Sequence, residues 1–409
     1  MTAPLPRATF IRLAGLAALL GAAGCATARH AARPDPTAPV ERVEMEPMAL
    51  AVVGAGPARH VEAYDAGSLF QEASAALSAE RFEGALEGYD RLIREFPAST
   101  YAVASLYNAG LAAEGLKNYA GAAARYRTLV DTHGDTKDAL DALFRLGACL
   151  AEIENWPASA EAFGQLLGHA EISTFDRIEG LARRGLAQYN MKDRAASERT
   201  FREAMTLYRE RQEVERLDAD FFVAMSQYYL GELAHDEFRA VPVRLPERQM
   251  KRDLEDKARL LLVAQGRYVD VARIKNVAWA TAAGYQMARL YREFYDQVMA
   301  APAPTMTTEE RQVYFEELKK YLEPLLLKAI HAHELTQMVA QRNGVDNEWV
   351  RRSGEELEQL KALVTPAVGG AEAPAAGPPL RGHPTRPELE KREPPPLPPR
   401  DENPRRGLM

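Results

Sequence analysis

The sequence predicts an all-α protein built from a row of similar helix pairs. Small residues recur at a spacing of about 37 residues within segments of helical composition, as in repeat proteins. Prolines, which interrupt helices, collect toward the two ends of the chain instead. The recurring small residues occupy one predicted structural position in successive repeats: Ala73, Gly110, Gly147, Gly185 and Gly231.

Each of the first four repeats carries three further signals in a fixed order. First comes a bulky or turn-forming residue: Phe82, Tyr119, Trp156 and Arg194. A second small residue follows: Ala85, Ala122, Ser159 and Ser197. An aromatic residue stands one helical turn later: Tyr89, Tyr126, Phe163 and Phe201. The small residues predict close approach of two helices, and the aromatic ring is expected to fill the space under the next repeat.

This order of small, small and aromatic positions resembles the tetratricopeptide repeat. About five copies cover Val61 to Phe238, with Pro97 and Gly134 closing the first two. The resemblance implies a right-handed superhelical solenoid of helix pairs. The lengthened loops are similar to those of the bacterial envelope version of the repeat.

Residues 239–364 are predicted to form C-terminal helical repeats and a cap. Their apolar residues keep a helical period beyond the loop that follows Phe238. A long helix is expected to run to Arg342, with Pro324 kinking or splitting it, and to end at Gly344. A last helix is expected from Asn347 to Leu363.

The two ends are predicted to lie outside the fold. Residues 1–25 read as an export signal, in which Ala22-Ala23-Gly24-Cys25 resembles a lipoprotein box that implies acylation of Cys25. A plain signal peptide is the alternative. Residues 26–60 are expected to form a disordered tether. Residues 365–409 are a Pro-rich tail that predicts disorder, and its segment "PPPLPPR" reads either as an SH3-type ligand or as a solvated spacer.

No catalytic, metal or cofactor site is predicted. A net charge of −7 argues against a nucleic-acid surface. The segment from Gly54 to Arg59 lacks the pattern of a dinucleotide-binding turn. Arg59 stands where the third small residue is needed, and no second strand ending in an acid is apparent. His331 and His333, followed by Glu334, stand two apart, whereas a zinc helix needs histidines four apart. Cys149 is expected to be a buried small hydrophobic residue.

The register of the repeats predicts which side chains face a partner. Positions three and two residues before each small anchor should line the groove formed by the first helices of the pairs. Aromatic, amide and arginine side chains there are typical anchors for a peptide or helix. The tetratricopeptide resemblance implies that Asn108 bonds the backbone of a bound peptide. The predicted groove residues are Phe70, Gln71, Tyr107, Asn108, Phe144, Arg145, Arg183, Tyr228 and Tyr229.

The sequence therefore predicts a non-enzymatic scaffold for protein partners, without a cofactor. The stretch from Tyr89 to Val130 resembles envelope repeat proteins of the BamD and CpoB kinds, which implies a lipid anchor in the outer membrane, facing the periplasm, and a role in β-barrel assembly or cell-wall coordination. An accessory lipoprotein of a motility, pilus or secretion machine is the alternative. An enzyme or solute-binding protein that uses the C-terminal helices also stays open.

Overall fold

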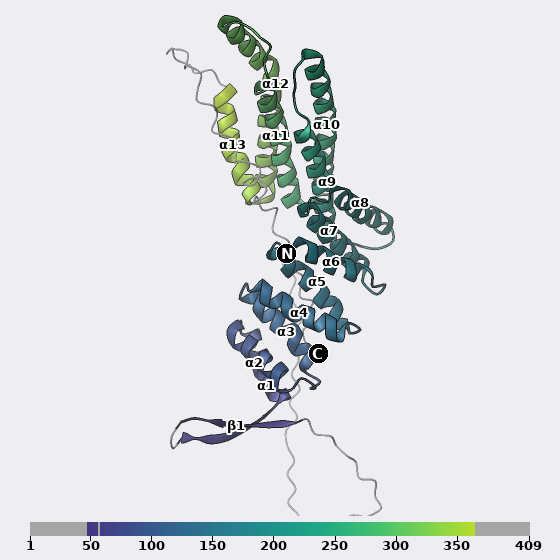
Figure 1. The fold of residues 1–409 in the computed structure, drawn as a ribbon, viewed down its shortest axis with the longest axis vertical. Coiled ribbons are helices and arrows are strands. Elements are labelled where there is room, and N and C mark those ends of the chain that lie inside the picture. The colour runs from purple at the N-terminus through teal and green to yellow at the C-terminus, as the bar shows by residue number, and fades with distance from the viewer. Residues whose placement is uncertain (1–46, 56–57, 365–409) are drawn as a thin grey trace, which may run out of the picture. The chain divides into compact units, whose positions relative to one another are not determined.

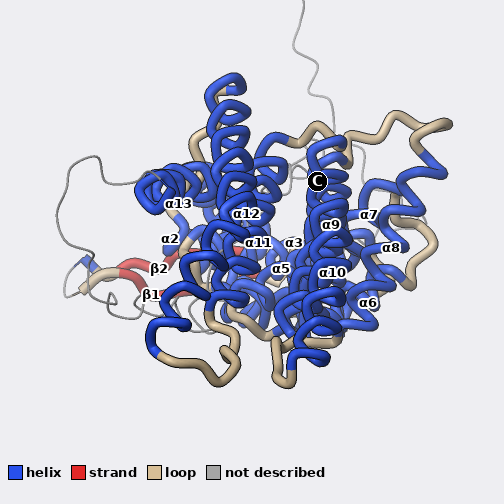
Figure 2. Tube along the Cα trace, turned by 90° about the horizontal axis from the view of Figure 1, so that it is seen from above, coloured by secondary structure: helices blue, strands red, loops and turns tan. Residues whose placement is uncertain are grey.

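The computed structural model describes residues 47–55 and 58–364. Helices dominate these residues, and strands occur in one hairpin (Figure 1, Figure 2). The described residues contain thirteen α-helices that pack one against the next, which confirms the all-α array of helix pairs. The predictions on the signal peptide, on Cys25, on residues 26–46 and on the tail 365–409 lie outside the described residues.

A two-stranded hairpin precedes the helices. Strand β1 (Met48–Val53) pairs antiparallel with β2 (His60–Asp65), and Val52 lies opposite Val61. The prediction of a disordered tether over residues 26–60 is therefore wrong for these strand residues. Their β-branched side chains favour extended backbone, and Gly54 leaves β1 with a φ of +94°, which glycine adopts freely. The glycine stretch thus lies between two hairpin strands.

Eight helices after the hairpin form four pairs. Each pair turns through a non-glycine residue in the left-handed region: Glu80, Lys117, Glu154 and Lys192. An Asn or Asp side chain caps the second helix of the later three pairs: Asn118, Asn155 and Asp193. The helices are α1 (Ala66–Ser78), α2 (Phe82–Glu95), α3 (Ala102–Gly115), α4 (Tyr119–His133), α5 (Lys137–Glu152), α6 (Trp156–Leu167), α7 (Thr174–Asn190) and α8 (Arg194–Arg211).

The small residues mark the close approach of the two helices of a pair, as predicted, but the aromatic ring covers the small anchor of its own pair, where the sequence predicted packing under the next repeat. A Cβ added to Gly147 would stand 2.7 Å from the Phe163 ring, and one added to Gly185 would stand 2.6 Å from the Phe201 ring. Tyr126 covers Gly110 in the same way. The four aromatic rings are buried: Tyr89, Tyr126, Phe163 and Phe201. The positions that were aligned in the sequence are therefore the ones that contact each other in the structure.

Longer helices continue the array, namely α9 (Asp220–Ala240), α10 (Glu247–Arg273), α11 (Val277–Met299), α12 (Thr308–Asn343) and α13 (Glu348–Val364). The Tyr268 ring covers Gly231, so α9 and α10 repeat the earlier contact. In the next pair Thr336 of α12 stands over Gly284 instead. Pro324 lies inside α12 without dividing it. Gly344 ends α12 in the left-handed region, as predicted.

The odd-numbered helices form a continuous row. Besides its neighbours in sequence, α3 packs against α1 and α5, and the same relation continues through α7, α9, α11 and α13. The even-numbered helices pack against the helices before and after them in sequence. Side chains on successive odd-numbered helices can therefore form a shared surface, here called the odd-helix surface.

Candidate partner-binding surface

An arginine joins two helices of the odd-helix surface. Arg145 of α5 donates from Nε to the Tyr107 hydroxyl of α3 at 2.9 Å, and from Nη1 to the Glu114 carboxylate at 3.2 Å. The Tyr126 hydroxyl donates to the same carboxylate at 2.6 Å. The side chain of Arg145 keeps 15% of its surface exposed, and that of Glu114 keeps 26%. The structure thus brings two predicted groove residues, Tyr107 and Arg145, into one polar cluster.

The electrostatics of this cluster hold it in one protonation state. Burial, followed by the Glu114 carboxylate, raises the pKa of the Tyr126 hydroxyl well above its ordinary value of 10. The hydroxyl therefore stays protonated and donates its hydrogen bond across the neutral pH range. Sequence reasoning missed Glu114 and Tyr126 as members of the site, because their contribution depends on where Arg145 lies.

Three predicted groove residues belong to the core instead. The Phe144 ring packs on Phe163 at 6.2 Å, and the Tyr229 ring stacks on Phe201 at 5.6 Å. Tyr228 packs against Trp279 at 5.1 Å. Phe144, Tyr228 and Tyr229 are no more than 5% exposed, so they do not face a partner. The register misplaced the two tyrosines because α7, α8, α10 and α11 together cover α9 on several sides.

The remaining groove positions on α1 and α3 differ in how far they are exposed to solvent. The Phe70 ring packs on Tyr101 at 5.0 Å and on Tyr89 at 5.8 Å, so it contributes to the fold. Gln71 is exposed. Asn108 is half-buried and hydrogen-bonds the Tyr89 hydroxyl, a contact that works against the rise in the Tyr89 pKa caused by burial. Gln71 and part of Asn108 are thus accessible from solvent.

Arg183 lies in a buried ion pair. Its Nε donates to Glu179 at 2.6 Å, one turn earlier on α7, and both side chains are less than 10% exposed. The guanidinium also stands over the Phe222 ring of α9. Arg183 therefore joins α7 to α9, and its accessibility to a partner is small.

A second polar cluster joins α9 to α11. Glu293 of α11 accepts from Arg239 Nε at 2.8 Å and from Arg289 at 2.8 Å, and His235 Nε2 lies 3.1 Å from it. Exposure of 17% for the Glu293 side chain and 28% for Arg239 leaves one edge open to solvent. Sequence reasoning missed this cluster. The available signal was the helical spacing of polar Gln286, Arg289 and Glu293 in the otherwise apolar stretch "GYQMARLYREFY".

Burial and charge fix the protonation of the second cluster. Burial, reinforced by Arg239, lowers the pKa of His235 to about 4. Burial would by itself raise the pKa of Glu293, but His235 and Arg239 more than offset it and lower the pKa well below 4.5. Burial raises the pKa of Glu232, whose carboxylate accepts from the Tyr268 hydroxyl at 2.5 Å. The cluster thus holds a neutral histidine and an ionised Glu293 at neutral pH.

Two histidines of α12 and the cysteine of α5 are the remaining residues that could carry chemistry. His331 is exposed and His333 is buried, so the two rings lie on different faces of α12. His333 Nδ1 lies 2.9 Å from the Ser353 hydroxyl oxygen of α13. Cys149 is buried, as predicted. Within residues 47–55 and 58–364, no three His, Cys, Asp or Glu side chains gather in a metal-binding arrangement.

The same described ranges contain no helix that is both long and apolar enough to cross a membrane.

Comparison with known proteins finds the repeat in one segment of the chain. Residues 104–136, which span α3 and α4, match the tetratricopeptide repeat family. No curated protein matches the chain.

Several solved structures are distantly similar. MamA from Desulfovibrio magneticus RS-1 is 15% identical over 52% of this chain and 97% of that one, with a TM-score of 0.34. A tetratricopeptide repeat protein from Parabacteroides merdae is 14% identical over 72% and 98%, with a TM-score of 0.35. The C-terminal part of such a protein from Cytophaga hutchinsonii is 13% identical over 72% and 95%, with a TM-score of 0.39.

These distant likenesses add nothing to the family assignment. It rests on the match at residues 104–136 and on the small and aromatic contacts that recur from pair to pair. On these two grounds, the chain contains a tetratricopeptide repeat in α3 and α4, within an array of similar helix pairs.

Proposed function

We propose that this chain is a non-enzymatic scaffold that binds a protein partner on the odd-helix surface. The observation that carries the proposal is the fixed position of Arg145 between Tyr107 and Glu114, with part of its side chain open to solvent. An arginine that is already held in place loses little freedom on binding, and such side chains are common anchors in interfaces.

Two amides on neighbouring odd-numbered helices, each at least partly open to solvent, support the same surface. Gln71 of α1 is exposed, and half-buried Asn108 of α3 occupies the position from which the tetratricopeptide resemblance implies contact with a peptide backbone. The cluster around Glu293 extends the polar character to α9 and α11. A partner with an extended backbone and both charge signs fits these groups.

The sequence supports a cell-envelope setting for this scaffold. The residues Ala22-Ala23-Gly24-Cys25, which resemble a lipoprotein box, support a lipid anchor in the outer membrane, facing the periplasm. There it serves the assembly of an envelope complex, either in β-barrel assembly or in the coordination of cell-wall synthesis.

The test is recovery of the partner from crosslinked membranes. Asn108→Ala combined with Arg145→Ala should weaken recovery several-fold, because truncating a central interface anchor typically costs more than about 1 kcal/mol. Arg202→Ala is the matched control, since Arg202 lies on α8 with its side chain 51% exposed and pairs with Glu198 of its own helix. It should leave recovery unchanged.

Thermal melting of both variants separates binding from folding. Arg145→Ala also removes bonds to Tyr107 and Glu114, so a small decrease in melting temperature is expected for it. If the double variant recovers the partner as well as the parent does, while deletion of residues 365–409 abolishes recovery, the tail is the binding element and the proposal is wrong.

A further inference from the structure

The first turns of α12 extend past the helices that pack beside the rest of it. Gly284 of α11 lies against Thr336, and Lys328 of α12 lies over the Tyr291 ring, so the two helices run antiparallel and α11 ends near Tyr321. From Thr308 to Tyr321 no side chain is buried. At 1.5 Å per residue this segment is about 20 Å long.

Helix α13 stops short of the same segment. Val350 near its start accepts from Gln337 of α12, and Ser353, further along α13, contacts His333, so α13 runs toward the start of α12. Continued to its end, this antiparallel pairing puts Val364 level with about Leu322 of α12, and Val364 packs against the core. Figure 1 shows the start of α12 reaching past the end of α13. The chain beyond Val364 therefore begins close to the uncovered turns of α12.

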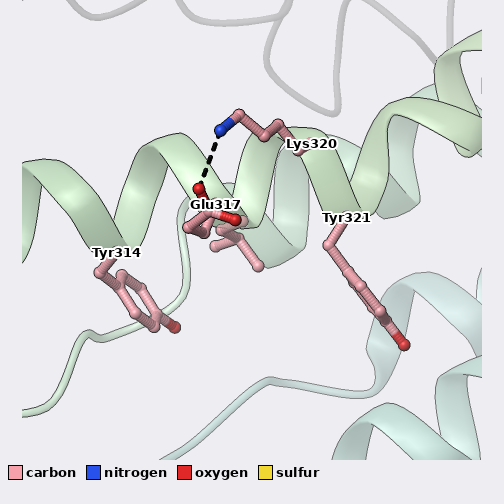
Figure 3. A pocket seen from close by; sticks show the side chains of 5 residues that line it. Tyr314, Glu317, Lys320 and Tyr321 are labelled. Atoms are coloured by element: carbon pink, nitrogen blue, oxygen red, sulfur yellow. Dashed lines mark hydrogen bonds and ion pairs between the residues drawn. The ribbon is translucent and has the colours of Figure 1, made fainter.

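The uncovered segment carries an apolar and aromatic face. Tyr314, Leu318 and Tyr321 follow one another at helical spacing, and Tyr321 is 82% exposed. Figure 3 shows Tyr314 and Tyr321 pointing to the same side of α12, with Glu317 between them. Tyr314 and Leu318 are half-buried, and an aromatic face that is open to solvent in this way marks a docking surface.

Two adjoining hollows lie along this face and share Tyr314. One is lined by Tyr314, Glu317, Leu318, Lys320 and Tyr321. The other extends to the loop before α12 and is lined by Thr305, Met306, Glu309, Glu310, Val313 and Tyr314. The hollows therefore combine aromatic rings with an excess of carboxylates, which suits a proline-rich ligand that ends in a basic residue.

We propose that residues 394–400 of this chain's own tail, Pro-Pro-Pro-Leu-Pro-Pro-Arg, dock on this face of α12. In a polyproline helix, prolines three residues apart are spaced by about 9 Å, at 3.1 Å per residue. Tyr314 and Tyr321 are spaced by about 10 Å along α12, at 1.5 Å per residue. The Pro395 and Pro398 rings thus reach the two tyrosines, and Arg400 reaches the carboxylates. In this arrangement the tail binds the face of α12, and the odd-helix surface stays available to a protein partner.

The connecting chain is long enough for this contact. The sequence has 29 residues between Val364 and Pro394, and a random-coil chain of about that number has a root-mean-square length on the order of 30 Å. The docking face runs from Tyr321, near the end of α13, over about 20 Å to Thr308, by the helical rise. Because the two lengths agree, the tail is present at its own site at a high effective concentration. The exposed ion pair between Lys320 and Glu317, 2.8 Å apart, contributes little and can exchange for Arg400.

The test uses a fluorescent synthetic peptide of residues 388–404 and the full chain. In one chain variant the tail is disabled by Pro395→Ser, Pro398→Ser and Arg400→Glu. The peptide should bind this variant at least about tenfold more tightly than the parent, whose own tail competes. Adding Tyr314→Ala and Tyr321→Ala to this variant should weaken its affinity for the peptide at least about tenfold. Adding Leu262→Ala instead, at an apolar residue of α10 that is 64% exposed, should leave peptide binding unchanged.

The proposal is overturned if the peptide does not bind the tail-disabled variant, or if removal of both tyrosines leaves binding unchanged. Hydrogen exchange of residues 308–322 is then measured in the parent chain at two protein concentrations about tenfold apart. It shows whether the bound tail comes from the same chain or from a second copy. Protection that does not depend on concentration supports docking within one chain. Protection that grows with concentration assigns the face to a second copy and overturns the intramolecular contact.

Discussion

The Phe163 ring occupies the space in which a side chain at Gly147 would stand. A Cβ on Gly147 would lie 2.7 Å from Cζ of that ring, and the backbone carbonyl of Gly147 accepts from the Ser159 hydroxyl at 2.8 Å. The glycine, the small Ser159 and the aromatic ring therefore form one contact between α5 and α6. Equivalent contacts recur at Gly185 and Gly231, which explains how the same signals build successive helix pairs.

Replacing Gly147 by Leu should destabilise the fold by roughly 1–3 kcal/mol or more, because the new side chain overpacks the contact with Phe163. The free energy of unfolding from urea denaturation measures the effect. Gly266→Leu is the matched control, since a Cβ at that exposed position of α10 meets nothing within 4 Å. Because leucine has a higher helix propensity than glycine, Gly266→Leu should keep or raise the stability, and an equal loss in both variants would contradict the assigned role of the Phe163 contact.

Removal of Glu293 should destabilise the fold by roughly 3–5 kcal/mol, because Arg239 and Arg289 would keep their charges in a mostly buried site without a counterion. Glu293→Ala can be compared with Asp256→Ala, whose ion pair with Arg259 is more than 60% exposed on both sides. The exposed pair should contribute less than about 1 kcal/mol. Similar losses in the two variants would contradict the assigned role of Glu293.

Stability should fall with acidification through the normal range of histidine. Burial lowers the pKa of His333 from 6.5 to about 4, so the folded chain keeps the ring neutral while the unfolded chain takes up a proton. The contribution of this group is therefore full above pH 6.5 and is lost as the pH falls toward 4, by roughly 1–3 kcal/mol. Urea denaturation across this range measures it.

His333→Gln should flatten that dependence, since glutamine can still bond Ser353 without titrating. His331→Gln, an exposed change two residues away, is its control. An unchanged slope in His333→Gln would show that other groups carry the acid sensitivity, among them His235, whose pKa is also lowered to about 4.

Acylation at Cys25 can be tested by metabolic labelling with palmitate. The label should be present on the parent chain and absent from Cys25→Ser, because the small residues before the cysteine resemble a lipoprotein box. Cys149→Ser should keep the label, as that thiol is buried within α5. Label that persists on Cys25→Ser would remove the basis for the lipid anchor.

Much of the helical fold could be predicted because its signals are local. The paired spacing of Gly110 with Tyr126 and of Gly147 with Phe163 lies within one repeat, and the structure keeps it. The hairpin strand from Met48 to Val53 was missed, because six residues with one glycine turn carry a weak signal beside a proline-rich stretch.

The candidate surface could be predicted only in part. Tyr107 and Arg145 were found from their register, and the structure joins them at 2.9 Å. Tyr228 and Tyr229 hold the same register positions but are buried, because α9 is packed by helices that come both before and after it in sequence. Register gives the direction of a side chain on its own helix, whereas exposure depends on what else packs there.

The sequence by itself determined the helix pairs, their register and the absence of a disulfide framework, because each depends on residue type and short spacing. Only the tertiary structure decided which polar side chains meet. Glu293 joins His235 and Arg239 across more than 50 positions of sequence, at 3.1 Å and 2.8 Å. Such contacts follow from the packing of whole helices, where burial makes an unpaired charge costly and so selects the partner that lies within reach.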